Sequence, residues 1–215
     1  EPPPARAGLP LVVFYGDSRA AEWTPPNLPG YTFVNRGIGA QTTAQALGRL
    51  PQDLLLLEPD IVVVQVGIND LKTLPLFPAQ APATIQNTKD NIRAIVQRAL
   101  DAGAQRVILT TIFPVGEVPL ERRLVWSEAV DAAIVEVNAS LLALAGERVV
   151  VLETGPILAE ASGKVAAAYR RDTLHLRGEG YAALNQALAA LLAPLVRQGL
   201  GRAVGGVLVI RQIAR

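Results

Sequence analysis

The chain has 215 residues, a formal net charge of +1, one histidine and no cysteine, and half of its residues are hydrophobic. This size fits a single domain with a substantial core, and the composition excludes disulfides, thiolate chemistry and a zinc site built from His and Cys. Its interspersed charges lack the Lys and Arg clusters of a nucleic-acid surface, and no apolar run is long enough to span a membrane.

The pattern along the chain predicts one domain with a short segment at each end. Residues 1–8 are rich in proline and unpatterned, which is typical of a flexible arm. We expect residues 9–199 to form the domain and residues 200–215 to be a C-terminal extension of unknown role. The protein is expected to be soluble, and either cytoplasmic or exported after removal of an N-terminal segment.

Residues 11–23, LVVFYGDSRAAEW, predict a buried strand that meets a helix at a tight turn. Ser18 follows the strand's carboxyl end, where open α/β sheets bind their ligands, and the start of the helix directs N–H groups to the same place. Ser18 is therefore a candidate nucleophile whose own N–H helps to hold an oxyanion. The alternative is that Asp17 or Ser18 only caps the helix.

Four more strands alternate with helices along the rest of the chain. The expected strands are residues 31–35, 60–66, 106–112 and 148–152. The expected helices begin at Thr42 or Thr43, span residues 84–103, span residues 120–145 with Trp126 inside, and span residues 179–196. This alternation predicts a parallel sheet with helices on both faces. Because parallel strands end at one edge, the polar loops after the first three strands should form a site.

Asp172 and His175 lie three residues apart just before the last predicted helix. In a tight turn the carboxylate can reach the imidazole, fix its tautomer and stabilise its protonated form while His175 takes the proton of Ser18. The alternative is a surface histidine beside a helix capped by Asp172. Asn69 is by default a turn residue, but its amide and the backbone N–H groups of Ala40 and Ser18 would make a three-donor oxyanion hole.

Four segments, in this order, resemble the conserved blocks of the SGNH, or GDSL, hydrolases. They are Gly16–Ser18, Asn35–Thr42, Gly67–Asp70 and Asp172–His175. The resemblance covers residues 11–196. It implies an α/β fold of the flavodoxin-like type, a three-layer α/β/α sandwich with a central, mainly parallel five-stranded sheet. It also implies ester hydrolysis through an acyl-enzyme, with a small-molecule ester as the partner and no metal or cofactor.

The resemblance also implies a role for individual residues. In the family, the serine of the first block is the nucleophile, which here is Ser18. Asp172 and His175 would complete the catalytic triad, and Asn69 would be an oxyanion donor. The supporting positions would be Asp17, Gly39 and Gly67.

Ala40 departs from the family pattern, whose second oxyanion donor is usually a glycine. Because the donor is a backbone N–H, alanine can serve if its φ is negative. The added methyl narrows the space beside the carbonyl, which bears on the size of the acyl group. The segment around it, residues 35–43, is similar to relatives that act on small acyl groups, such as sugar-acetyl esterases and platelet-activating-factor acetylhydrolases. We therefore expect an acetyl-type group on a sugar, lipid or other small alcohol.

Other functions fit parts of the pattern. The same triad would serve an acyltransferase, a lysophospholipase or a thioesterase, and the access of water to the acyl-enzyme separates transfer from hydrolysis. A dinucleotide site would use Gly37 and Gly39, but Thr42 stands where a third Gly or Ala is needed. A non-catalytic ligand-binding domain is disfavoured because every catalytic position is filled.

Overall fold

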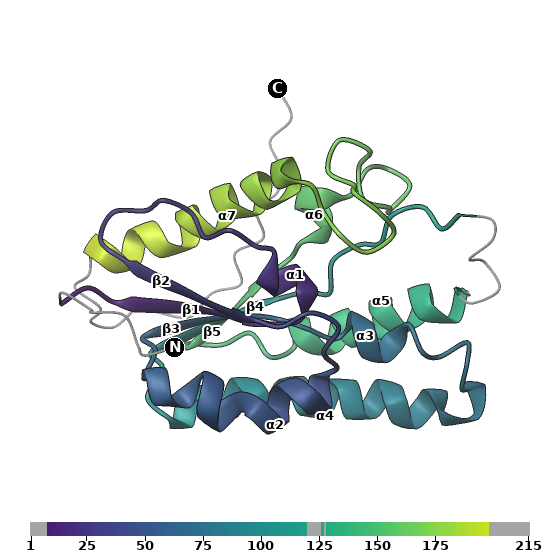
Figure 1. The fold of residues 1–215 in the computed structure, drawn as a ribbon, viewed down its shortest axis with the longest axis horizontal. Helices are drawn as coiled ribbons and strands as arrows, with labels where there is room; N and C mark the ends of the chain where they lie inside the picture. Colours follow the sequence, from purple (N-terminus) through teal and green to yellow (C-terminus); the bar gives the residue numbers. More distant parts are fainter. Residues whose placement is uncertain (1–7, 120–125, 127, 198–215) are drawn as a thin grey trace.

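A five-stranded sheet lies between two layers of helices in this computed structural model, which describes residues 8–119, 126 and 128–197 (Figure 1). The strands are β1 (Leu11–Gly16), β2 (Thr32–Gly37), β3 (Ile61–Gln65), β4 (Arg106–Thr110) and β5 (Val149–Leu152). Every neighbouring pair is parallel, in the order β2-β1-β3-β4-β5. The predicted flavodoxin-like fold is therefore confirmed.

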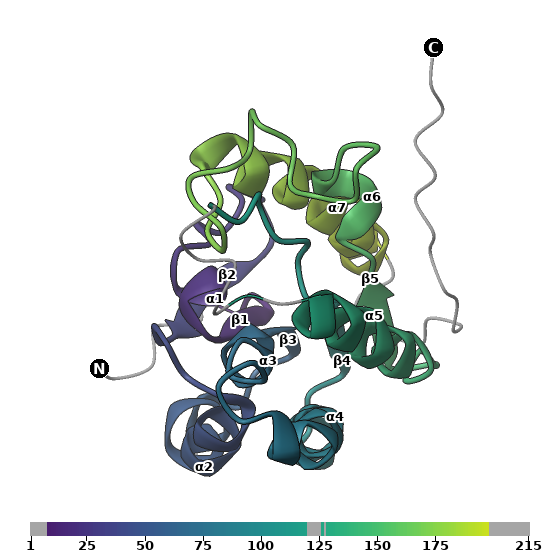
Figure 2. The ribbon, with the colours of Figure 1, turned by 90° about the vertical axis from the view of Figure 1, so that its right-hand side faces the viewer.

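The helices form a layer on each face of the sheet (Figure 2). One layer consists of α2 (Thr43–Asp53), α4 (Ala81–Asp101) and α5 (Glu128–Leu142), and the other of α6 (Gly155–Leu158) and α7 (Gly178–Arg197). Two short helices, α1 (Ser18–Ala21) and α3 (Ile68–Leu71), follow the carboxyl ends of β1 and β3. Single 3₁₀ turns lie at Leu55–Leu57 and Pro78–Gln80.

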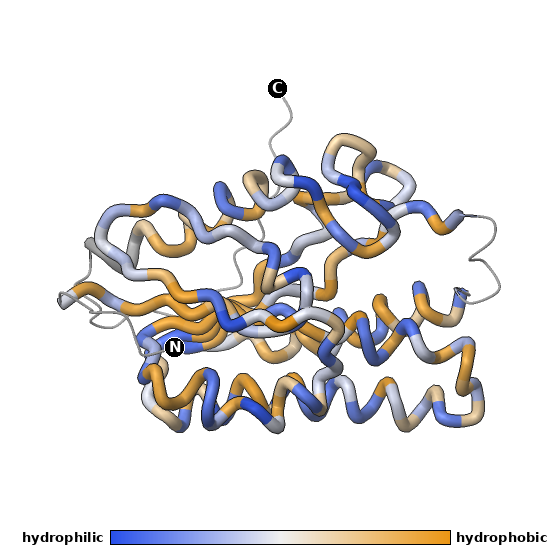
Figure 3. The backbone as a smooth tube through the Cα atoms, viewed as in Figure 1, coloured by the Kyte–Doolittle hydropathy of each residue, from blue (hydrophilic) through white to orange (hydrophobic). Residues whose placement is uncertain are grey.

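The buried side chains of β1 alternate between two hydrophobic cores. Leu11, Val13 and Tyr15 pack with the layer of α2, α4 and α5, whereas Val12 and Phe14 pack with α7. Both faces of the central strands are thus covered, which explains their uninterrupted apolar sequences. Figure 3 shows this concentration of hydrophobic residues along the strands between the helices.

The prediction of a helix over residues 120–145 is wrong at Trp126, and residues 120–125 and 127 lie outside the part of the chain that the structure describes. Helix α5 begins at Glu128, and Trp126 lies ahead of it in a bend, packed against the core. Acidic side chains at Glu128 and Asp131 favour a helix N-terminus here, because they complement the helix dipole. The predicted arm at residues 1–8, apart from Gly8, and the extension at residues 200–215 lie outside the described residues.

Two glycines allow the backbone around α1 to pack closely. Gly16 has φ of 151°, and a Cβ there would lie 1.6 Å from the carbonyl oxygen of Gln65 in β3. A Cβ on Gly37 would lie 2.1 Å from the backbone nitrogen of Ala21. Since these neighbours are backbone atoms, no side-chain movement can relieve either contact. The two glycines therefore set the position of α1 between β1, β2 and β3.

Replacing Gly37 with alanine should lower the free energy of unfolding by about 1–3 kcal/mol or more, because the added methyl overlaps the backbone of Ala21. Gly48 in α2 is the matched control, since a Cβ there meets nothing within 4 Å. Gly48→Ala should raise the free energy of unfolding by about 0.5–1 kcal/mol, the usual gain in a helix. Urea unfolding followed by circular dichroism measures both, and equal effects of the two variants would contradict the packing argument.

Candidate functional site

The site lies where the order of the strands reverses, at the carboxyl ends of β1 and β3. From β1 the chain passes to β2 on one side and then to β3 on the other, which leaves a crevice of the kind that binds ligands in open α/β sheets. Ser18 follows β1 in α1, and Asn69 follows β3 in α3. The topology therefore places these two predicted residues at one edge.

Asp17 caps α1, and this leaves the hydroxyl of Ser18 available. The Asp17 carboxylate accepts a hydrogen bond of 2.9 Å from the N–H of Arg19. The backbone N–H of Asp17 donates to the carbonyl of Gln65 over 3.1 Å. Ser18, the first helical residue, instead places its Oγ 3.0 Å from Nε2 of His175. Asp17 therefore caps the helix, and Ser18 is left to contact His175.

His175 joins Ser18 to Asp172 in a continuous chain of hydrogen bonds. Its Nδ1 lies 2.9 Å and 3.0 Å from the two carboxylate oxygens of Asp172. If Nδ1 carries the proton and donates to Asp172, Nε2 remains an acceptor for the hydroxyl of Ser18. All three side chains that the sequence singled out are therefore brought together.

Asp172 also closes the turn that holds the imidazole. Its Oδ1 accepts hydrogen bonds from the backbone N–H groups of Leu174, over 2.8 Å, and of His175, over 2.9 Å. Partial burial raises the pKa of this carboxyl, but these two bonds and the imidazole outweigh it and lower the pKa to about 2. Asp172 is consequently ionised throughout the neutral range, as an acceptor for Nδ1–H must be.

Three hydrogen-bond donors, at Ser18, Ala40 and Asn69, follow the carboxyl ends of β1, β2 and β3. Asn69 is buried, and one N–H of its amide donates to the carbonyl of Gln41 over 2.9 Å, so the second N–H is held in a fixed direction. The backbone N–H groups of Ser18 and Ala40 donate to no acceptor in the part of the chain that the structure describes. Such preoriented, unused donors are suited to stabilising a negatively charged oxygen.

The condition of a negative φ at Ala40 is not met, because the structure gives this residue φ of 62°. Its backbone N–H is nevertheless unused among the described residues, so Ala40 stays a candidate donor. The left-handed region costs an alanine about 1–2 kcal/mol. Surrounding hydrogen bonds hold the loop in this conformation. Asn69 binds the carbonyl of Gln41, Arg49 of α2 donates to the Gln41 side chain, and the N–H of Ile38 donates to the carbonyl of Gly16.

The two supporting glycines have different surroundings. Gly67 has φ of 128° and immediately precedes α3, where a Cβ would lie 3.0 Å from Cδ1 of Ile112. Gly39 is exposed, and a Cβ there would meet nothing within 4 Å. Close packing therefore accounts for a glycine at residue 67 but not at residue 39.

Arg19 is a further residue of the site, which pattern analysis missed. It is fully buried, although arginine is rarely so. Its Nε donates to the carbonyl of Leu174 over 2.7 Å, and its Nη1 donates to the carbonyl of Phe113 over 3.1 Å. Burial lowers the pKa of Arg19 to about 10 and raises that of Asp17 to about 6. The guanidinium thus joins the helix that begins with Ser18 to the turn that contains His175.

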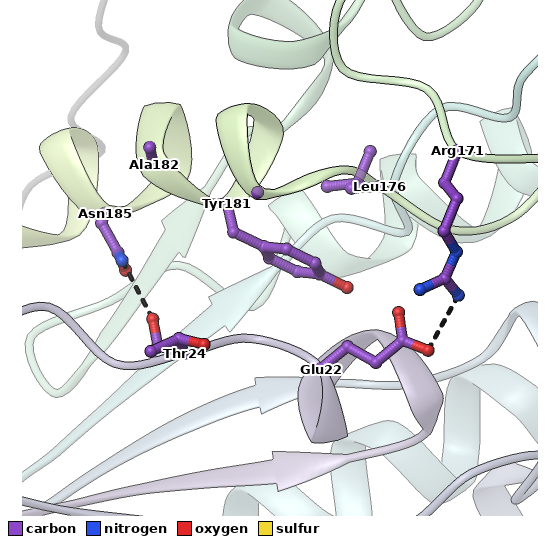
Figure 4. A pocket seen from close by; sticks show the side chains of 8 residues that line it. Glu22, Thr24, Arg171, Leu176, Tyr181, Ala182 and Asn185 are labelled. Carbon is purple, nitrogen blue, oxygen red and sulfur yellow. Dashed lines mark hydrogen bonds and ion pairs between the residues drawn. The ribbon is translucent and has the colours of Figure 1, made fainter.

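A second link between the same two segments lies nearer the surface. Arg171 donates to the carboxylate of Glu22 over 2.9 Å, beside a pocket of about 280 Å³ between α1 and α7. Figure 4 shows this ion pair and, to its left, the ring of Tyr181 from α7. Burial raises the pKa of Tyr181 above its ordinary range, so its hydroxyl stays neutral.

The described residues contain neither a metal-binding cluster nor a membrane-spanning helix. No group of three or more His, Cys, Asp or Glu side chains there is arranged to hold a metal ion. None of the helices described has the length and apolar character needed to cross a membrane.

Comparison with known proteins gives a consistent result. The model of the GDSL-like lipase/acylhydrolase family matches residues 7–183. Platelet-activating factor acetylhydrolase IB subunit alpha1 of Pongo abelii is 31% identical over 205 residues, which cover 90% of this chain and 80% of the relative.

Two solved structures illustrate the likeness in fold. A GDSL-like lipase from Bacteroides thetaiotaomicron has a TM-score of 0.63 and 25% identity, over 88% of each chain. An acetyl xylan esterase has a TM-score of 0.66 and 19% identity, over 85% of this chain and 99% of the other.

Replacing Arg19 with lysine should keep the positive charge but lose the pair of hydrogen bonds to the carbonyls of Leu174 and Phe113. We expect the reaction of Ser18 with a small organophosphonate to slow on the order of 10²-fold, the cost of a misplacement of about 1 Å. Because His175 is the only histidine, its proton NMR signals are identified without further assignment, and its Nδ1–H resonance should shift. Arg93→Lys, at an exposed position of α4, is the control. An unchanged imidazole signal and reaction rate in Arg19→Lys would show that Arg19 only stabilises the fold.

Proposed function

The chain belongs to the GDSL-like lipase/acylhydrolase family and is a carboxylic ester hydrolase, and we propose that Ser18, His175 and Asp172 are its catalytic triad. The observation that carries this proposal is the unbroken hydrogen-bonded chain from Ser18 Oγ through the imidazole to the Asp172 carboxylate. It has the geometry that a serine nucleophile and its general base require.

In the first step, Ser18 Oγ attacks the carbonyl carbon of the ester. Nε2 of His175 takes the hydroxyl proton, and the ionised Asp172 stabilises the imidazolium that forms. The negative charge on the carbonyl oxygen is held by the N–H groups of Ser18 and Ala40 and by the amide of Asn69. The intermediate collapses when the alkoxide leaves with the proton from Nε2, so that the acyl group remains on Ser18.

In the second step, water replaces the alcohol. His175 removes a proton from water as the oxygen attacks the acyl-enzyme, and the same proton returns to Ser18 Oγ when the acid leaves. Each step therefore uses the imidazole once as a base and once as an acid. This requires Nε2 to be unprotonated at the start of each step.

A short, acetyl-type acyl group is the proposed substrate feature. The curated relative that is 31% identical to this chain is an acetylhydrolase by name. In this chain, Ala40 adds a methyl group to the loop that supplies an oxyanion donor. If that methyl borders the acyl group, it takes up space that a glycine would leave open.

Replacing Ser18 with alanine should lower kcat for p-nitrophenyl acetate by roughly 10⁴-fold or more, because the acyl-enzyme cannot form. Ser162→Ala, at an exposed residue whose hydroxyl donates to Glu160, should leave the rate unchanged. Mass spectrometry of the quenched reaction should find an acetyl group on Ser18 in the parent protein. Near-normal hydrolysis by folded Ser18→Ala would refute the triad. If the parent protein, given an added alcohol, forms more of that alcohol's acetate ester than free acetate, the reaction is acyl transfer instead.

Replacing Ala40 with glycine should increase hydrolysis of butanoate relative to acetate esters. The expected change corresponds to about 1–3 kcal/mol, the usual value of one methylene-sized group in a pocket. The ratio of kcat/KM between the two chain lengths is the quantity to measure, because glycine also changes backbone freedom and so affects both esters. A ratio that stays within about twofold would show that the methyl does not border the acyl group.

A further inference from the structure

A second pocket, of about 440 Å³, is lined by residues that are close in the chain to the proposed catalytic residues. On one side it is lined by Lys72 and Thr73, which directly follow α3, the helix of Asn69. On another side it is lined by Thr173 and Leu174, which lie between Asp172 and His175 in the chain. Its volume is typical of small-molecule sites. Its lining residues are thus neighbours in the chain of both a proposed oxyanion donor, Asn69, and the proposed general base, His175.

The walls of this pocket are mainly apolar. Four hydrophobic side chains line it, those of Leu76, Val118, Trp126 and Leu174. The two threonine hydroxyls donate within the protein, from Thr73 to the Asp70 carbonyl over 2.6 Å and from Thr173 to the Glu117 carbonyl over 3.4 Å. Among the lining residues that the structure describes, Lys72 alone carries a charge. These residues offer a ligand apolar surface and one ammonium group.

Lys72 differs from the other lysines of the chain, Lys89 and Lys164. Those two form ion pairs, with Glu136 and Asp131 respectively. Lys72 forms no ion pair with any residue that the structure describes, although it is partly buried.

The nearest acid in sequence is already engaged elsewhere. The carboxylate of Asp70 accepts hydrogen bonds from the backbone N–H of Thr43, over 2.9 Å, and from its hydroxyl, over 2.7 Å. An ammonium that lines a pocket and forms no ion pair with a described residue favours an anion supplied by a ligand.

We propose that this pocket binds the alcohol part of an ester that has an apolar body and a carboxylate, with Lys72 as the partner of the carboxylate. This inference rests on the proposed function, because the leaving oxygen must take its proton from Nε2 of His175. The alcohol part therefore lies on the side of His175, where Leu174 begins the apolar wall. An aromatic acid esterified at its hydroxyl is the simplest molecule of this class.

The test compares 4-acetoxybenzoate with its neutral methyl ester, two aryl acetates of the same shape around the scissile bond. Lys72→Gln should lower kcat/KM roughly fivefold more for the anion than for the neutral ester, the scale of one solvent-accessible charge pair. Comparing each variant with the parent protein cancels the intrinsic reactivity of the two esters. Lys89→Gln, outside the pocket, is the matched control, and the selective loss should shrink as salt is raised.

Binding of 4-acetoxybenzoate to the Ser18→Ala protein separates this inference from the proposed function. Calorimetry on that background should find weaker binding when Lys72→Gln is added, whether or not the parent protein turns the ester over. Equal binding with and without Lys72, or equal loss for the anionic and neutral esters, would overturn the assignment of Lys72. Hydrolysis that persists in Ser18→Ala would overturn the proposed catalytic function and leave the binding result standing.

Discussion

The hydrogen bonds of the buried Arg19 guanidinium are the interaction on which the geometry of the site depends. Ser18 and His175 are 157 positions apart in the chain, so the covalent backbone does not fix the distance between them. Arg19 directly follows Ser18 and binds the carbonyl of Leu174, which directly precedes His175. A buried charge is costly unless it is hydrogen-bonded. Moving the carbonyl of Leu174 or Phe113 away from Arg19 would therefore cost free energy, and this fixes the positions of both carbonyls. These hydrogen bonds keep the hydroxyl of Ser18 within hydrogen-bond distance of the imidazole of His175.

The sheet itself fixes the positions of Ser18 and Asn69 relative to each other. The reversal of strand order between β1 and β3 opens the crevice, and the close approach of Gly16 to Gln65 brings the turn after β1 against the end of β3. Ser18 and Asn69 therefore stand on neighbouring strands without any long loop between them and the core. Functional groups on rigid elements need little reorganisation when charge develops on the substrate.

Much of this could be predicted from the sequence, because the signals are local. Continuous apolar strands, the turn at Gly16 and the three-residue spacing of Asp172 and His175 each depend on nearby residues only. Those signals predicted the parallel sheet and the three side chains that meet. The rest depends on tertiary contacts. The burial of Arg19 and the left-handed conformation of Ala40 depend on contacts with residues that are distant in the chain.

The separation of 157 positions between Ser18 and His175 has a kinetic consequence. Contacts between distant residues close long loops, and they form late in folding because their entropic cost is met only after more local structure exists. During synthesis, β1 leaves the ribosome well before the turn with Asp172 and His175. A nascent chain that ends before this turn therefore lacks the proposed general base of Ser18. The proposed triad is complete only when the last segment of the domain has been synthesised and has packed against α1.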